Sequence, residues 1–123
     1  MAYVTDMRLT PDSLFRALAD PTRLRSIVLL QREGELCVCE LTHALGIIQP
    51  KISRHLAILR EDSIVSDHRA GHWVYYRLNP DLPDWARTVI EATTGGVHDV
   101  GPYADDHSVL VDMPNRPGTR CCA

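Results

Sequence analysis

The sequence predicts a mainly α, winged helix-turn-helix fold, with about five helices and a β-hairpin wing. Three observations support this fold class. Short amphipathic segments fill the first 60 residues, and two of them open with a capping residue and a proline. Two later segments are separated by a break at Gly46, as in a helix-turn-helix. Two strand-like runs then follow directly, with Gly71 between them.

The first two helices are expected to begin at capping pairs. Thr10-Pro11 and Asp20-Pro21 each place a side-chain acceptor before a proline at the first helical position. Apolar residues then recur at helical spacing, and Gly34 ends the second segment. In the first helix Leu14, Phe15 and Leu18 share one face, and in the second helix Leu24, Ile27 and Val28 are expected to face inward.

The next two helices form the expected helix-turn-helix, and a hairpin follows it. The third helix is short and ends at Gly46, whereas the fourth opens at Pro50. Runs of β-branched and aromatic residues at 64–67 and 73–78 predict the two strands of the wing. The side chains expected in the core are those of Leu41, Ala44 and Leu45 in the third helix and Ile52, Leu56 and Leu59 in the fourth.

A last helix is expected to begin near Pro83, with Trp85, Val89 and Ala92 on one side. From Thr94 the helical pattern stops, and four of the seven glycines and three of the eight prolines lie in the last 30 residues. This composition is typical of a mobile segment. We therefore predict a DNA-binding and dimerisation domain over residues 1–93. A flexible tail is expected over residues 94–123, in which 108–111 are strand-like and Cys121-Cys122 form a terminal pair.

Composition narrows the class of protein. The 123 residues are 45% hydrophobic and 24% charged, which is typical of one ordinary globular domain. Apolar runs fall short of the roughly 20 residues that span a bilayer, and the N-terminus does not resemble a signal peptide. We expect a cytoplasmic protein without a membrane partner, whose four cysteines stay reduced. The net charge of −3 argues against indiscriminate nucleic-acid binding.

Polar and basic residues gather at the start of the fourth helix and in the wing. Residues 49–77 contain five basic and three acidic side chains, whereas the segment after 94 contains four aspartates and two arginines. The start of a recognition helix is where base-reading and phosphate-contacting groups lie. Taken alone, the polar face of this helix is equally explained as a face exposed to solvent. The basic residues of the wing beside it favour a DNA-binding surface. The candidate contacts to double-stranded DNA are Gln49, Lys51, Ser53, Arg54, His55, Arg69 and His72.

Two thiols lie at the start of the third helix. Cys37 takes the N-cap position, where an oxygen acceptor is usual, and Cys39 follows two residues later. Side chains at i and i+2 do not face each other on a regular helix, so one ion binds both sulfurs only if the first turn is distorted or not yet wound. The helix dipole also favours the thiolate that binds soft ions. The alternative is a pair of ordinary buried cysteines.

A third thiol ligand is expected from the C-terminal pair. Adjacent α-carbons lie about 3.8 Å apart, which is too short for an unstrained disulfide between Cys121 and Cys122. A flexible chain of the 27 residues from 94 to 121 spans roughly 30 Å, enough to return to Cys37 and Cys39 on the same or a partner subunit. An idle terminal pair is the alternative.

These motifs together resemble the ArsR/SmtB family of metal-responsive winged-helix repressors, over about residues 9–93. The segments ELCVCEL (35–41), QPKISRHL (49–56) and GHWVYYRL (71–78) look especially like the arsenical-resistance branch. The resemblance implies a homodimer built on the first and last helices and an operator of two half-sites. It also implies release when As(III) or Sb(III) binds the cysteine thiolates, with no organic cofactor.

The sequence departs from that branch at two positions. Thr42 stands where the best-known arsenic sensors have a third cysteine, and Ile48 stands where a capping serine is usual. A cadmium- and lead-sensing branch shares Cys-Val-Cys but adds thiols in an N-terminal arm, and no cysteine precedes Cys37 here. That branch is therefore the second interpretation.

Two further classes of protein are alternatives to a metalloid-responsive repressor. A thiol enzyme would need Cys-Xaa-Xaa-Cys, or a nucleophile beside a base on a βαβ scaffold, and the sequence shows neither. We therefore expect a protein that is not an enzyme. A metal-free repressor that senses oxidants through Cys37 and Cys39 remains the alternative.

Overall fold

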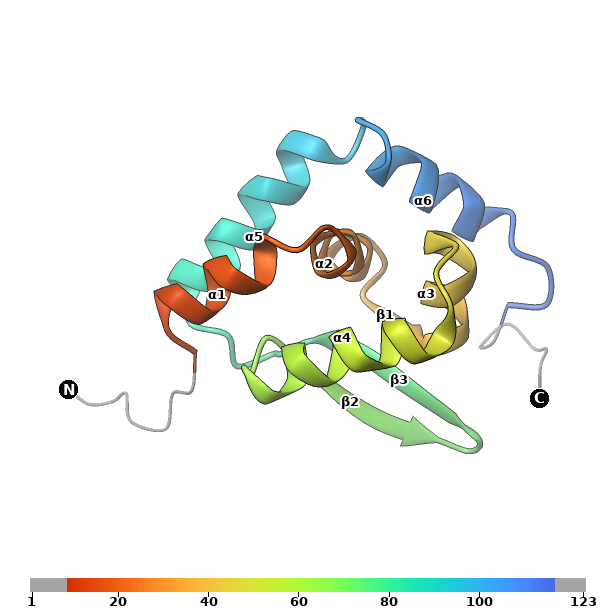
Figure 1. Ribbon diagram of the computed structural model, residues 1–123, viewed down its shortest axis with the longest axis horizontal. Helices are drawn as coiled ribbons and strands as arrows, with labels where there is room; N and C mark the ends of the chain where they lie inside the picture. Colours follow the sequence, from red (N-terminus) through yellow and green to blue (C-terminus); the bar gives the residue numbers. More distant parts are fainter. Residues whose placement is uncertain (1–8, 117–123) are drawn as a thin grey trace.

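The computed structural model describes residues 9–116, which form six helices and a three-stranded sheet (Figure 1). The winged helix-turn-helix prediction is confirmed, with a sixth helix and a third strand added. Within residues 9–116, no helix is long and apolar enough to cross a bilayer. The elements in chain order are α1 (Pro11–Leu18), α2 (Pro21–Glu33), β1 (Glu35–Cys37), α3 (Val38–Leu45), α4 (Gln49–Glu61), β2 (Val65–Ala70), β3 (Trp73–Leu78), α5 (Asp84–Val97) and α6 (Tyr103–Val111).

The first two helices begin at the predicted caps. Thr10 Oγ1 accepts from the Ser13 amide at 3.1 Å, and Ser13 Oγ accepts from the Thr10 amide at 3.0 Å, which is a reciprocal capping box. Asp20 Oδ2 accepts from the Arg23 amide at 3.0 Å. Gly46 ends α3 with φ +67°, a left-handed conformation that glycine adopts without a steric penalty.

The core forms around α2, which Figure 1 shows nearly end-on in the middle of the molecule. The predicted stripes of α3 and α4 are buried, and Ile52, Leu56 and Leu59 are fully so. In α1, Leu14 and Ala17 are buried, whereas Phe15 is 54% exposed.

The wing belongs to an antiparallel sheet in the order β1-β3-β2. The predicted hairpin is confirmed, with Gly71 at φ +63° in its turn. Strand β1 was not predicted, because three residues are too few to show a strand pattern. It pairs Cys37 with Tyr75 of β3, so the base of the wing lies directly beside the start of α3.

The prediction of a flexible tail from residue 94 was wrong for the residues that the structure describes. Helix α5 continues to Val97, and residues 108–111 are helical within α6. Asp106 is buried and bound by Arg25 through Nε at 2.9 Å and Nη2 at 2.6 Å. Arg25 Nη2 also donates to the Leu45 carbonyl, at the end of α3. This ion pair and the fully buried Leu110 hold α6 against α2 and α3.

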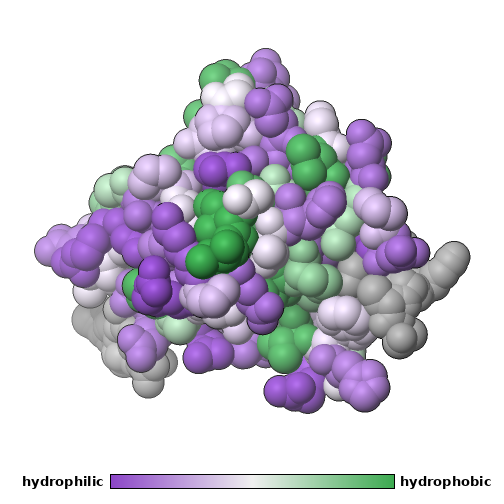
Figure 2. Space-filling model, turned by 45° about the vertical axis from the view of Figure 1, so that its right-hand side comes forward, coloured by the Kyte–Doolittle hydropathy of each residue, from purple (hydrophilic) through white to green (hydrophobic). Residues whose placement is uncertain are grey.

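The face that carries the C-terminal segment is mainly hydrophilic, with a few apolar patches (Figure 2). The chain after α6 leads to Arg116, the last described residue. Cys121 and Cys122 lie outside the described residues.

Candidate functional site

The two thiols at the start of α3 lie in direct contact. Cys37 is both the last residue of β1 and the N-cap of α3, with an extended backbone at φ −88° and ψ 168°. Cys39 lies in the first turn, and the two Sγ atoms are 2.7 Å apart. The predicted N-cap position of Cys37 is confirmed. Because Cys37 is not wound into the helix, both sulfurs converge while the first turn of α3 stays regular.

A carboxylate fixes the backbone beside these thiols. Glu40 Oε1 accepts from the Cys37 amide at 2.8 Å, and Glu40 Oε2 accepts from Arg116 Nε at 2.7 Å. The Glu40 side chain is 3% exposed. This contact was not predicted, although an acid three residues after the N-cap is the signal of a capping box. The start of α3 is thereby tied to the C-terminal segment.

Burial, together with the hydrogen bond to Cys39, raises the pKa of the Cys37 thiol to about 12. The helix dipole was expected to favour the thiolate. At Cys37 the loss of hydration outweighs the dipole, because the residue is buried. The structure therefore describes a neutral Cys37 thiol before any ion binds.

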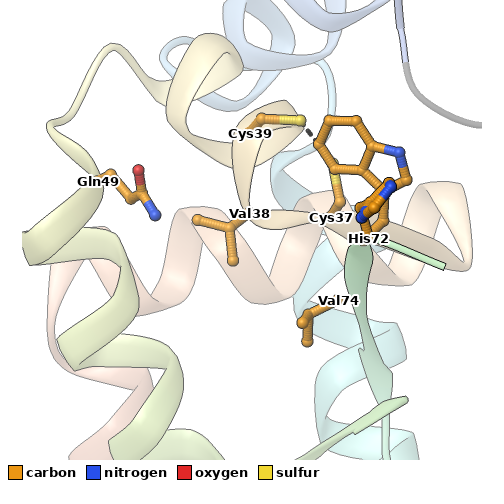
Figure 3. Close-up of a pocket in the computed structure, with 7 residues that line it drawn as sticks. Cys37, Val38, Cys39, Gln49, His72 and Val74 are labelled. Carbon is orange, nitrogen blue, oxygen red and sulfur yellow. Dashed lines mark hydrogen bonds between the residues drawn. The ribbon is translucent and has the colours of Figure 1, made fainter. Parts of the chain in front are cut away.

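A cavity of about 290 Å³ opens over the thiols and joins them to the predicted DNA-reading elements. Figure 3 shows side chains from the start of α3, the start of α4 and the wing around this cavity. An ion at the sulfurs would therefore share its space with both elements that are expected to meet DNA. The lining residues are Cys37, Val38, Cys39, Gln49, His72, Trp73 and Val74.

Thr42 occupies the next position on the same side of α3, one turn beyond Cys39. Its Oγ1 is buried and has no hydrogen-bond partner among the described residues. Within residues 9–116, no group of three or more Cys, His, Asp or Glu side chains is placed to hold a metal ion. The described part of the site is thus a two-sulfur site.

The start of α4 presents most of the predicted DNA-reading residues. Gln49, Lys51 and Arg54 are exposed, and Ser53 is half-buried. The wing tip adds Arg69 and His72, both exposed, on either side of the turn at Gly71.

His55 was also predicted to face DNA, and here the structure gives a different role. Its side chain is 12% exposed, with Nδ1 3.2 Å from Arg23 Nη1 and 3.8 Å from Asp20 Oδ2. Burial lowers the pKa of His55, against the opposing charge of Asp20. Because position 55 of α4 faces the start of α2, the imidazole links these two helices.

Comparison with known proteins identifies the family. The chain is 53% identical over 111 residues to the "Arsenic resistance transcriptional regulator ArsR1" of Pseudomonas putida, covering 89% of this chain and 84% of that protein. The chain belongs to the arsR family of bacterial regulatory proteins. The family model matches residues 20–67, from the start of α2 into β2. The "Arsenical resistance operon repressor" of Escherichia coli is 54% identical over 83 residues, which cover 68% of this chain and 71% of that protein.

Solved structures of regulators confirm the winged-helix fold of this arsR-family chain. HlyU from Vibrio cholerae matches with a TM-score of 0.63 and 30% identity, over 70% of this chain and 89% of that one. The "AntR antimony-specific transcriptional repressor" matches with a TM-score of 0.58 and 30% identity, over 70% and 75%. The predicted family is confirmed, as is the prediction of a regulator that is not an enzyme. A helix-turn-helix regulator binds DNA, so DNA is a partner of this chain.

Proposed function

We propose that this chain is a trivalent arsenic- or antimony-responsive repressor that binds operator DNA as a homodimer. As(III) or Sb(III) binds Cys37 and Cys39 and releases the protein from DNA. The observation that carries the proposal is the shared cavity, in which the two touching sulfurs lie beside Gln49 of α4 and His72 of the wing. Relatives named as arsenic resistance regulators and a structural neighbour named as antimony-specific support the choice of ion.

The chemistry of binding is an exchange of oxygen for sulfur ligands. Each thiol replaces one hydroxide of arsenous acid, so that one S–H and one As–O bond are exchanged for an As–S bond and a water molecule. The two sulfurs then move from mutual contact to the separation that the arsenic requires. Because Cys37 ends β1 and Cys39 belongs to α3, this movement changes how the sheet and the helix-turn-helix meet.

Release requires that the ion bind the DNA-free conformation more tightly than the DNA-bound one. A coupling of about 1–3 kcal/mol is the usual range for such a switch. The residues with the shortest route from the sulfurs to DNA are Gln49 and His72, because they line the same cavity.

The third ligand is proposed to come from Cys121 or Cys122. Arg116 is held against Glu40, whose other oxygen binds the Cys37 amide, so the chain passes close to the sulfur pair before residue 121. Five residues span at most about 17 Å. The alternative is a two-sulfur complex in which arsenic keeps one hydroxide.

The homodimer is proposed to form on α1 and α5. Both helices pack on α2 yet leave large aromatic side chains in water, with Phe15 54% and Trp85 39% exposed. A symmetric contact would bury both side chains. The two reading helices would then meet half-sites about one helical turn, roughly 34 Å, apart or a multiple of it.

The deciding experiment is a DNA-release titration under reducing conditions with arsenite, antimonite, cadmium and zinc side by side. We expect arsenite and antimonite to release the operator at the lowest concentrations. Release by cadmium alone would favour the cadmium- and lead-sensing interpretation. Release by peroxide but not by arsenite would favour the metal-free redox interpretation.

A further inference from the structure

We propose that Ile48 is a specificity-determining residue that reads the C5-methyl group of a thymine in the major groove. The inference rests on the DNA-binding part of the proposed function and is independent of the inducing ion. Ile48 is the N-cap of α4 and is 70% exposed, the highest value among the exposed large apolar side chains of the described residues.

The position of Ile48 is fixed by its backbone and leaves its side chain free. Its carbonyl accepts from the Lys51 amide at 3.1 Å and the Ile52 amide at 3.2 Å, which holds the residue at the helix start. The side chain makes no capping hydrogen bond. The preceding Ile47 packs against the core, whereas Ile48 does not belong to it.

The surroundings of Ile48 indicate what its side chain contacts. Gln49, Lys51 and Arg54 are exposed in the first two turns of α4, so the apolar side chain lies at the end of a helix that carries groups suited to DNA. The edge of a base pair in the major groove offers one apolar group, the thymine methyl. Figure 1 places α4 and the wing on the opposite side of α2 from α5, one of the two helices of the proposed dimer surface.

The first measurement removes only the methyl group from the DNA. A duplex is selected from a random library with the full-length protein without metalloid, and each thymine is then replaced by deoxyuridine. We expect one thymine in each half-site whose replacement weakens binding about fourfold, the effect of one buried methyl group. If every replacement changes affinity less than twofold, the inference is overturned. If no duplex is selected, the DNA-binding proposal fails with it.

The second measurement uses Ile48→Ser, which removes the apolar side chain and supplies a capping hydroxyl. We expect this variant to fold with an unchanged or higher Tm and to bind thymine and deoxyuridine duplexes equally. Ile58→Ser is the matched control, because Ile58 is 37% exposed on the same helix but lies in a later turn. It should keep the preference for thymine. A preference that survives in Ile48→Ser would overturn the inference.

Discussion

The four helices before the wing begin in two different ways. Helices α1 and α2 have oxygen caps, in which Thr10 and Asp20 accept from amides of the first turn. Helices α3 and α4 begin at Cys37 and Ile48, and neither side chain forms a conventional oxygen cap. The first pair forms part of the scaffold, and the second pair forms the helix-turn-helix.

This difference shows where the sequence exchanges local stability for function. An oxygen cap contributes typically about 1 kcal/mol to helix stability. At Cys37 the position is used for a sulfur ligand, and Glu40 replaces part of the missing cap by binding the Cys37 amide. At Ile48 the position is used for an exposed apolar side chain. Departures from local rules are expected at functional sites, and here they fall on neighbouring helix starts.

The largest expected effect follows from making α3 resemble α1 and α2. Cys37→Ser supplies an oxygen cap and removes one of the two sulfurs. We expect operator affinity to be retained and arsenite-induced release to be lost. Cys39→Ser should also lose release, but without the gain of a cap. Electrophoretic mobility shifts with increasing arsenite measure both properties, and release of Cys37→Ser at the wild-type arsenite concentration would refute the proposed switch.

The next effect concerns the position one turn beyond Cys39. Thr42→Cys should provide a third sulfur on α3 and lower the arsenite concentration for half-release by about tenfold, because a held ligand acts at high effective concentration. Thr42→Val is the control. It removes the buried hydroxyl that lacks a partner among the described residues, so we expect unchanged release and equal or higher stability. An unchanged arsenite response in Thr42→Cys would mean that Thr42 does not face the bound ion.

A parallel experiment tests the third-ligand proposal. The double replacement of Cys121 and Cys122 by serine should weaken arsenite binding in the wild-type background. The same double replacement should matter less when Thr42→Cys is present, because the third position is then filled from α3. Equal arsenite affinity with and without the C-terminal thiols would leave a two-sulfur complex as the mechanism.

A smaller effect tests the scaffold caps themselves. Thr10→Ala should lower the free energy of unfolding by about 1 kcal/mol, because the Ser13 amide loses its acceptor. Ile48→Ala should leave it nearly unchanged, since no capping bond is lost. Urea denaturation followed by circular dichroism measures both. Equal losses in the two variants would remove the distinction between the helix pairs.

The part of the fold that could be predicted is the part encoded by local signals. These signals lie within one or two helical turns, and the structure agrees with each. They are the caps at Thr10-Pro11 and Asp20-Pro21, the helix end at Gly46, and the apolar face of α4. Helix α6 was missed because its main polar anchor joins Arg25 to Asp106, 81 residues apart. Its glycine- and proline-rich surroundings resemble those of a disordered segment. Strand β1 was missed because only its pairing with β3 defines it.

The site could be predicted in part for the same reason. Cys37 and Cys39 are close in the sequence, and the N-cap position of Cys37 was predicted. The contact between their sulfurs beside a regular first turn was not, because it depends on the extended backbone of Cys37 at the end of β1. The inward direction of His55 depends on where α2 begins, which the sequence of α4 does not contain. The approach of Arg116 to Glu40 depends on α6, so it could not be expected before that helix was known.

The smallest expected effect is a pH dependence of stability, which arises where α4 contacts the start of α2. His55 of α4 lies between Arg23 and Asp20 at the start of α2, and burial lowers its pKa below the ordinary value of 6.5. At pH values just below 6.5 the unfolded chain therefore binds more protons than the folded one. The contribution of His55 to the free energy of unfolding should be fully present above a pH of about 6.5. It should be lost as the pH falls from the pKa of His55 in the unfolded chain to its lower pKa in the folded protein.

His55→Gln keeps a polar side chain and removes this titration. We expect the wild-type Tm to fall between pH 7.5 and 5.5 and the Tm of His55→Gln to fall less. Asp20 does not titrate in this pH range, because its pKa is lowered from 3.8. Burial raises the pKa of Asp20, but the hydrogen bond from the Arg23 amide and the charges of His55 and Arg23 outweigh burial. The Asp20 contribution is therefore lost only at still lower pH. Identical pH profiles for the two proteins would show that the imidazole linking α4 to the cap of α2 is not the group that titrates.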